Sequence, residues 1–358
     1  MKVNFVSNLY PSDDFPYKGT FVKNIYDGFN SIGCKTHLIK LKDGNVNSFF
    51  KLINYLSFYL EMFFAALKAN EREVFYVHYA SHSSLGLLIA SLFKSKKKLR
   101  IITNVHGSDV LPSNQSLFSK IKVLLSQKIV ERSELVVAPS YFFQSILIKE
   151  FKVKEKKILV SPSGGVDASI FNSSCLEKEK KYTFGYVGRL EESKGIFDLL
   201  EAYKHLYVQN PDINLLIIGS GSMESRVQSF ANEIDGVTMI GGKTQKELSE
   251  FYPLIKFLVF PSKARESLGL IPIEAMMCGV PVICSMTGAT SEYIHSGMQS
   301  ISFLPGDQEG LNSVMQESIS MLSDEYIELS NLAVATANNY SSEKVISNLL
   351  TSFTSAIK

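Results

Sequence analysis

Short apolar runs alternate with longer amphipathic stretches along the whole chain. Such runs favour buried parallel strands, because helices cover both faces of a parallel sheet. In the first half the helical stretches lie at about 20–32, 49–68, 82–94, 115–132 and 140–150. The apolar runs between them are KVNFVSN, THLIKL, EVFYVHYA, LRIITNVHG, ELVVAPS and KKILVSPSG. This alternation predicts a doubly wound α/β domain.

The alternation stops at residues 169–181, SIFNSSCLEKEKK, which are polar, charged and aperiodic and which we interpret as a linker. A second series follows: YTFGYVG, INLLIIGSG, VTMIGG, KFLVFPS, PVICSMTG and ISFLPGD. Helices are expected at about 194–208, 222–233, 245–253, 269–278, 309–322, 324–338 and 341–356. We therefore expect two doubly wound domains with a cleft between them, where ligands bind at the carboxyl ends of strands.

Composition narrows the class of protein. The chain has 358 residues, enough for two domains, with 45% hydrophobic and 20% charged residues, so it is not disordered. The four cysteines, Cys34, Cys175, Cys278 and Cys284, lie far apart and favour a reduced, intracellular protein. The most apolar stretch, 49–67, is interrupted by polar residues, and no signal peptide is recognised. A cytoplasmic location is expected.

The net charge of +2 conceals an asymmetry. Residues 1–172 hold 23 Lys and Arg against 13 Asp and Glu, a net of +10, and the remainder carries −8. Basic residues cluster at 94–100 and 149–157. One interpretation is a helix packed on the sheet with a solvated lysine rim. The other is a domain resting on the anionic inner face of a membrane. Nucleic acid is not expected, because no aromatic residues interleave the basic ones.

Two segments of the second half could bind a charged sugar derivative. The segment 261–282, PSKARESLGLIPIEAMMCGVPV, contains Glu266 and Glu274, and carboxylates accept hydrogen bonds from sugar hydroxyls. The segment 185–203, GYVGRLEESKGIFDLLEAY, places Arg189 and Lys194 beside a strand-to-helix turn. Two cations there suit a departing diphosphate, although solvated surface cations would give the same pattern.

Together these segments resemble the retaining glycosyltransferases of family 4, which have the GT-B fold of two Rossmann-like, doubly wound domains facing each other across a cleft. The first carries the family's E-x7-E signature, with Leu268 where the family usually has Phe. The second carries G-R-L-x-x-x-K-G. The resemblance implies an acceptor-binding domain at 1–170 and a nucleotide-sugar-binding domain at 171–340. It also implies that the last helix, 341–358, packs back on the first domain.

The resemblance also assigns roles to residues. It implies that Glu266 holds the donor sugar, Glu274 the ribose, and Arg189 and Lys194 the diphosphate. His106, in the H-G-x-D motif, would contact the sugar, while Asp109 could instead cap the following helix. Glu292, in a loop like the family's G-G-x-x-E, would begin a helix near the donor, or be a simple helix-start acid. The remaining donor-binding positions are Gly19, Gly188, Gly219, Gly221, Ser267, Leu268, Gly269 and Leu270.

No D-x-D triplet, P-loop or clustered Cys and His occurs in the sequence, so neither a metal nor another cofactor is expected. The function expected is a metal-independent, hexosyltransferase-type enzyme that retains anomeric configuration. Its partners would be a nucleotide diphosphate sugar and a lipid-linked or saccharide acceptor, as in surface polysaccharide biosynthesis. Two alternatives remain: a catalytically silent partner subunit that binds nucleotide sugar, and a GT-B nucleotide-sugar epimerase.

Overall fold

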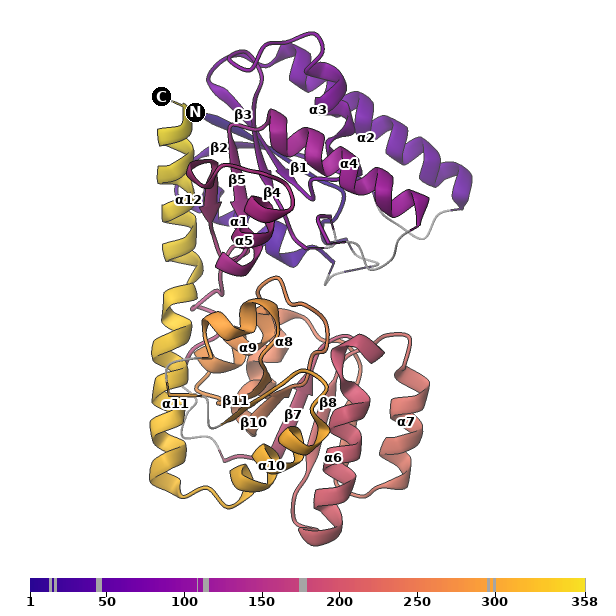
Figure 1. Cartoon of the computed structure of the whole chain (residues 1–358), viewed down its shortest axis with the longest axis vertical. Coiled ribbons are helices and arrows are strands. Elements are labelled where there is room, and N and C mark those ends of the chain that lie inside the picture. The colour runs from indigo at the N-terminus through magenta and orange to yellow at the C-terminus, as the bar shows by residue number, and fades with distance from the viewer. Residues whose placement is uncertain are drawn as a thin grey trace. The chain divides into compact units, whose positions relative to one another are not determined.

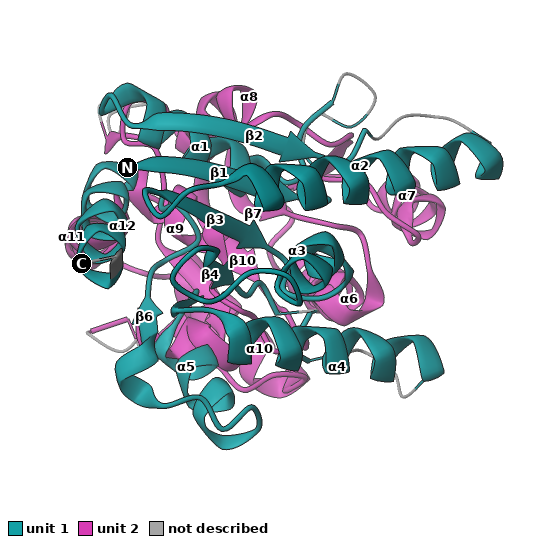
Figure 2. Ribbon diagram, turned by 90° about the horizontal axis from the view of Figure 1, so that it is seen from above, with its two compact units in different colours: residues 1–165, 342–358 teal, residues 166–341 magenta. Residues whose placement is uncertain are grey.

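The computed structural model forms two compact units. It describes residues 1–12, 15, 18–42, 47–107, 109–111, 116–173, 179–294, 297–298 and 301–357. Unit 1 comprises Met1–Gly165 with Ser342–Lys358, and unit 2 comprises Val166–Ser341 (Figures 1 and 2). Unit 1 is thus built from two separate parts of the chain.

Unit 1 contains a six-stranded parallel sheet in the order β2-β1-β3-β4-β5-β6. The order reverses direction between β1 and β3, the place where open α/β sheets bind their ligands. The strands are β1 (Lys2–Ser7), β2 (Lys35–Lys40), β3 (Glu73–His78), β4 (Arg100–Asn104), β5 (Leu135–Ala138) and β6 (Ile158–Val160).

Helices cover the two faces of this sheet and form two separate cores. One core contains buried residues of α2, α3, α4 and α5, and the other those of α1 and α12. The last helix of the chain therefore packs beside the first one, with Val345, Ile346, Leu349 and Phe353 buried. The helices are α1 (Thr20–Ser31), α2 (Ser48–Lys68), α3 (Leu85–Ala90), α4 (Leu117–Arg132), α5 (Tyr141–Lys149) and α12 (Ser342–Ile357).

Unit 2 contains a second parallel sheet, in the order β12-β11-β10-β7-β8-β9. Here the order reverses between β7 and β10, as in the doubly wound dinucleotide-binding domains. The strands are β7 (Tyr182–Val187), β8 (Leu215–Ile218), β9 (Val237–Ile240), β10 (Ile255–Phe260), β11 (Val282–Ser285) and β12 (Ser302–Phe303).

One continuous core joins this sheet to its helices. Helix α6 lies beside α10, and α9 lies beside α11. The helices are α6 (Ile196–Gln209), α7 (Glu224–Glu233), α8 (Gln245–Phe251), α9 (Leu270–Met277), α10 (Gln308–Ile319) and α11 (Ser323–Ala337). The predicted α/β class and its two doubly wound sheets are confirmed.

Three details of the sequence interpretation were wrong. The runs THLIKL, KKILVSPSG and VTMIGG are not fully buried: β2, β6 and β9 are edge strands, which have a neighbour on one side only. The helix expected at 82–94 is shorter, a 3-10 turn followed by α3. The expected linker 169–181 begins inside unit 2, because Phe171 is fully buried against Tyr252.

Candidate active site

Two loops meet in unit 2 where the strand order reverses. One follows β7 and the other follows β10, and these strands are neighbours in the sheet. The backbone N–H groups of Lys263 and Ala264 both donate to the carbonyl oxygen of Ser193, at 3.0 and 3.1 Å. These bonds fasten the two loops together, so that side chains far apart in sequence come into contact.

Gly195 makes this approach possible. It ends the 3-10 turn η4 (Glu192–Lys194) with φ at 70°, in the left-handed region that favours glycine. A Cβ at this position would lie 2.0 Å from the carbonyl oxygen of Pro261. No other residue type fits without moving one loop away from the other.

Lys194 and Glu266 form an ion pair at the junction of these loops. Lys194 Nζ lies 2.6 Å from Glu266 Oε1, and their side chains are only 19% and 11% exposed. Ser262 also donates its hydroxyl proton to Oε1. The second oxygen, Oε2, has no hydrogen bond to any residue that the structure describes. The pair therefore holds a carboxylate whose Oε2 is free to accept a hydrogen bond from a ligand hydroxyl.

Arg189 adds a second cation to this edge of the sheet. It is exposed, and its guanidinium has no hydrogen bond or ion pair within the described part of the chain. Its backbone carbonyl accepts a hydrogen bond from the buried Tyr186 hydroxyl at 2.8 Å, which fixes the turn. Burial raises the pKa of that hydroxyl, so Tyr186 stays a neutral donor. Within the described residues, the guanidinium of Arg189 therefore has no protein partner, and it lies on the same loop as Lys194.

The predicted glycine positions lie in this turn and in the loop after β8. The two loops touch so closely that a Cβ on Gly219 would lie 1.9 Å from the carbonyl oxygen of Gly188. A Cβ on Gly221 would lie 2.5 Å from the carbonyl oxygen of Leu190. The same two loops are also joined by a hydrogen bond of 2.8 Å, which the Ser222 hydroxyl donates to the Glu191 carboxylate. These glycines hold the backbone that presents Arg189.

Glu274 is the fifth of the eight residues of α9 and is almost fully buried. Its oxygens accept hydrogen bonds from Gln245 Nε2 at 2.9 Å and from the Tyr252 hydroxyl at 3.0 Å. Burial raises the pKa of this carboxyl, and the two hydrogen bonds oppose that rise. Neither partner was foreseen from the sequence, since 29 and 22 residues separate them from Glu274.

The segment Ser267–Leu270 leads into α9, as predicted, with Gly269 as the N-cap residue. Leu268 is buried in the core of unit 2, so only its backbone could meet a ligand. Glu292 differs from the prediction. It ends the 3-10 turn η6 (Gly288–Glu292) instead of beginning a helix, because the chain bends away after the turn.

In unit 1 the predicted His106 follows β4, and its ring lies 4.5 Å from that of Phe21, measured between centroids. Burial lowers the pKa of His106 to about 3, so its imidazole is neutral at pH 7. Its Nε2 lies 3.2 Å from Nδ1 of His78, at the end of β3. His78 was missed by the sequence reasoning, although its place at a neighbouring strand end was a usable signal.

Asp109 is a structural acid in unit 1. It accepts hydrogen bonds from the backbone N–H groups of Ala80, His106 and Gly107 at 2.8, 3.0 and 2.9 Å. These bonds reach back to the loops after β3 and β4, so Asp109 fixes the backbone of His106. Gly19 is the N-cap residue of α1, beside the carbonyl of Leu9 that follows β1.

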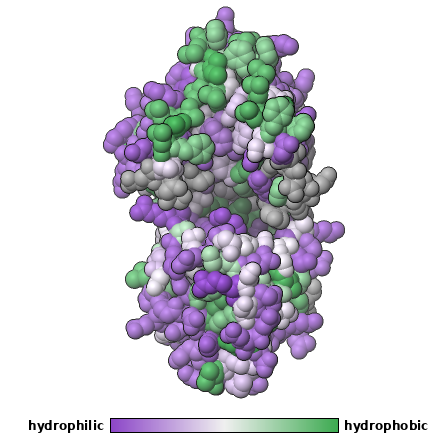
Figure 3. Space-filling view, turned by 90° about the vertical axis from the view of Figure 1, so that its right-hand side faces the viewer, coloured by the Kyte–Doolittle hydropathy of each residue, from purple (hydrophilic) through white to green (hydrophobic). Residues whose placement is uncertain are grey.

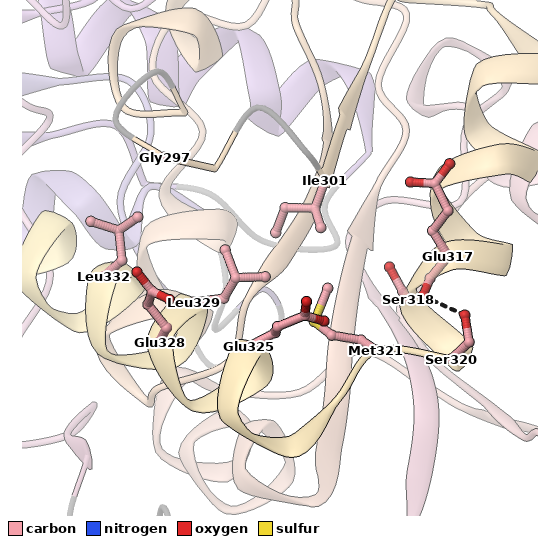
Figure 4. A pocket seen from close by; sticks show the side chains of 10 residues that line it. All are labelled: Gly297, Ile301, Glu317, Ser318, Ser320, Met321, Glu325, Glu328, Leu329 and Leu332. Carbon is pink, nitrogen blue, oxygen red and sulfur yellow. Dashed lines mark hydrogen bonds between the residues drawn. The ribbon is translucent and has the colours of Figure 1, made fainter.

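A cavity of about 470 Å³ lies elsewhere in unit 2, between α10 and α11. Figure 4 shows that Glu317, Glu325 and Glu328 carry the carboxylates near it. None of the residues predicted from the sequence lines this cavity. Within the described ranges, no group of three or more His, Cys, Asp or Glu side chains is placed to hold a metal ion. Cys34 and Cys284 are free thiols, Cys278 is buried, and Cys175 lies outside the described residues.

Comparison with known proteins identifies the family of the chain. Residues 170–339 match the family model described as Glycosyl transferases group 1, and residues 35–168 match that of Glycosyltransferase Family 4. N-acetyl-alpha-D-glucosaminyl L-malate synthase of Bacillus anthracis is 26% identical over 293 residues, which are 77% of this chain and 72% of that protein. An uncharacterised glycosyltransferase of Methanocaldococcus jannaschii is 25% identical over 66% of this chain, but the match spans only 62% of the archaeal protein.

The fold is similar to that of solved glycosyltransferase-like structures. The crystal structure of Anabaena HepE in complex with UDP superposes with a TM-score of 0.75 at 16% identity, covering 99% of this chain and 100% of HepE. The two doubly wound units are therefore those of the GT-B fold. The two family models together span residues 35–168 and 170–339, which is most of the sequence. The chain belongs to the group 1 glycosyltransferases of family 4.

Proposed function

We propose that this protein transfers a hexose from a nucleoside diphosphate sugar to an acceptor, with retention of anomeric configuration and without a metal ion. The observation that carries the proposal is the Lys194–Glu266 pair, held where β7 and β10 end. The name of the Bacillus relative specifies an alpha-D-glucosaminyl product, which is the anomer that retention gives from an alpha-linked donor. The HepE complex makes UDP the first nucleotide to test.

The charges in unit 2 suit the two ends of such a donor. The exposed guanidinium of Arg189 and the remaining N–H groups of Lys194 would bind the diphosphate. Oε2 of Glu266 would accept a hydrogen bond from a sugar hydroxyl. Glu274, whose oxygens each keep a lone pair beyond the bonds to Gln245 and Tyr252, would accept from the ribose. In unit 1, His106 is neutral, so it would bind a ligand hydroxyl without adding charge.

The reaction needs little covalent chemistry from the protein. The bond between the sugar's C1 and the diphosphate oxygen breaks, and its electron pair stays on the diphosphate. The acceptor oxygen forms the new bond to C1, and its proton passes to the diphosphate. Negative charge therefore grows on the leaving group, where Arg189 and Lys194 would stabilise it most strongly in the transition state.

The acceptor we propose is lipid-linked or a growing surface polysaccharide, reached at the inner face of the cell membrane. The charge of the first half of the chain supports this, since residues 1–172 carry a net +10. Fixed protein cations at Arg189 and Lys194 would take the part that a divalent metal plays in other glycosyltransferases.

A donor panel tests the function. Purified protein is incubated with UDP-, GDP- and dTDP-sugars, with and without acceptor, and released nucleoside diphosphate and products are measured. We expect release that depends on acceptor and persists in EDTA. Binding without turnover would instead identify a silent partner subunit, and conversion of the donor sugar alone would identify an epimerase. Loss of turnover in EDTA, restored by added metal, would contradict metal independence.

The variant Glu266→Ala should lower turnover by about 100-fold or more, because the carboxylate that holds both sugar and Lys194 is lost. A matched control is Glu201→Ala, which removes an exposed acid of α6 in the same unit. Unchanged turnover in Glu266→Ala would reject the site.

A further inference from the structure

Helix α2 carries apolar side chains on the face that points away from the core. Leu52, Leu56 and Leu60 lie about one turn apart and are all exposed, Leu52 by 67%. The opposite face buries Phe58 and Met62 in the core of unit 1. A helix on the surface of a soluble domain normally has polar residues on its outer face. α2 therefore has a second apolar face that no described residue covers.

Helix α4 has the same property. Leu117, Phe118 and Ile121 are exposed, the first by 75% and the second by 63%. Helix α3 contacts both α2 and α4 and lies between them, and both longer helices project beyond it (Figures 1 and 2). Figure 3 shows apolar side chains gathered on this part of unit 1. Single exposed apolar residues are normal, but a gathered set marks an interaction surface.

We call this surface the α2–α4 face, defined by Leu52, Leu56, Leu60, Leu117, Phe118 and Ile121. Its charged residues are mostly positive, although the exposed Glu61 follows Leu60 on α2. Lys51 lies on α2, and Lys120 and Lys122 lie on α4, with Lys122 Nζ 4.6 Å from the centre of the Phe118 ring. Residues 48–60 and 117–130 contain no Asp or Glu. Both helices also lack an acid in the first turn, where the helix dipole is positive.

Three lysines of the clusters predicted from the sequence, Lys94, Lys96 and Lys157, bind carbonyl oxygens at helix ends. Lys94 Nζ donates to the carbonyl oxygens of Ala66 and Ala69 at the carboxyl end of α2. Lys96 and Lys157 both donate to the carbonyl of Glu131 at the end of α4. They cap helix ends, which is favourable because the dipole is negative there. In α2, of 21 residues, this end lies about 30 Å from the first turn.

These observations favour one kind of binding partner for the α2–α4 face. By length and composition α2 could span a bilayer, but its buried side chains complete the core of unit 1 and could not leave it. A second copy of the chain, paired through the same face, would set lysines against lysines. A planar, apolar and anionic partner meets both properties at once.

We propose that the α2–α4 face docks on the surface of an anionic phospholipid bilayer. The leucines and Phe118 enter the boundary between headgroups and acyl chains, while Lys51, Lys120 and Lys122 contact lipid phosphates. Both helices begin at the sheet edge where the strands of unit 1 end, the edge that holds His106. That the same bilayer carries the acceptor rests on the proposed function; the docking itself does not.

Vesicle flotation tests the docking. The whole protein is mixed with phosphatidylcholine vesicles with or without about 30% phosphatidylglycerol, at about 0.05 M and 0.5 M salt. We expect binding to the anionic vesicles that weakens at high salt. The double variants Leu52→Ser/Leu56→Ser and Leu117→Ser/Phe118→Ser should each lower the partition coefficient by about tenfold or more. Both should keep the wild-type circular dichroism spectrum, because the replaced side chains are exposed.

Matched controls distinguish binding through this face from non-specific apolar binding and from attraction by lysines elsewhere on the surface. Val208 and Leu322 are equally exposed apolar residues of unit 2, so Val208→Ser/Leu322→Ser should bind as wild type. Lys51→Gln/Lys120→Gln/Lys122→Gln should weaken binding at least about fivefold more than Lys97→Gln/Lys98→Gln/Lys154→Gln.

The proposal is overturned if wild-type protein fails to float with anionic vesicles at low salt. It is also overturned if the face and control variants bind equally, or if light scattering shows a dimer that Leu52→Ser/Leu56→Ser dissociates. UDP binding, measured in parallel without vesicles, is expected to be unchanged in every variant. Failure of UDP binding in wild-type protein would count against the proposed function and leave the docking result intact.

Discussion

Nδ1 of His78 lies 3.2 Å from Nε2 of His106, and the two rings are stacked with their centroids 5.3 Å apart. Nε2 of His78 is buried without a hydrogen-bond partner. A buried N–H without an acceptor is rarer than a buried acceptor without a donor. His78 should therefore carry its proton on Nδ1 and donate it to His106. That leaves His106 with its own proton on Nδ1, where it can be donated to a ligand.

We predict that His78→Phe changes the tautomer of His106. Without the proton that His78 donates, Nε2 of His106 has no partner and the Nε2–H form gains population. The 15N chemical shifts of the His106 ring report this directly. We expect kcat/KM to fall by about tenfold, or roughly 1.4 kcal/mol, with the fold retained because Phe packs among the same rings. His205→Gln, an exposed position of α6, serves as the control. An unchanged His106 tautomer would contradict the assignment.

Stability should depend on pH through the same two rings. Burial lowers the pKa of His106 to about 3, and it also lowers that of His78, so the folded protein keeps both neutral. The unfolded chain binds these protons below about pH 6.5. The contribution of the two histidines to the free energy of unfolding is therefore fully present above that pH, and it is lost as the pH falls toward 3. His106→Asn should reduce the loss between pH 7 and 5 by about 2 kcal/mol in urea unfolding. Equal pH slopes in both proteins would count against this.

The Lys194–Glu266 pair should behave as one unit in a double-mutant cycle. Removing either partner leaves a mostly buried charge, so each alanine variant should lose about 1–3 kcal/mol of stability and at least about 100-fold in kcat. The double variant should lose far less than the sum, because the second change removes a charge already without its partner. Thermal unfolding measures this cycle for stability, and steady-state rates measure it for kcat.

The pair Lys263–Asp198 is a suitable comparison for that cycle, because its partners lie 3.1 Å apart but are more exposed. Its alanine variants should be nearly additive, with a coupling of about 0.5 kcal/mol or less. Additive losses at Lys194 and Glu266 would show that the two side chains act separately.

Gly195→Ala should impair the site although it leaves the side chains of Lys194 and Glu266 unchanged. The added Cβ would meet the carbonyl oxygen of Pro261, which would push the loop of Lys194 away from that of Glu266. We expect a loss of more than about 2 kcal/mol in stability and at least about tenfold in activity. Gly33→Ala has nearly the same φ with open space around it, so it measures backbone strain alone. Similar losses in both variants would refute the role of the contact.

The sequence predicted the elements well because each lies in a local pattern. Apolar runs ended at the turns that close the strands, and the helical stretches kept their period between them. α1 and α9 begin within one residue of their predicted starts. Edge strands were misjudged, because the sequence of THLIKL does not reveal how many neighbours β2 will have.

The site was predicted as a set of residues but not as contacts. Lys194 and Glu266 are 72 positions apart, and only the strand order that makes β7 and β10 neighbours brings them together. The partners of Glu274 and the bond between His78 and His106 depend on the same kind of non-local neighbourhood. The lysines at 94 and 157 could not be separated from lipid-facing ones, since helix capping appears only in three dimensions.

The last helix has a consequence for how the chain is made. Val345, Ile346, Leu349 and Phe353 of α12 share a core with the first strand, yet they are synthesised after all of unit 2. During translation the growing polypeptide must keep one side of the N-terminal sheet unfinished while nearly 180 further residues leave the ribosome. Truncated products that stop before Ser342 would expose to chaperones and proteases the apolar surface of unit 1 that α12 covers. Unit 2 would already be complete in such products.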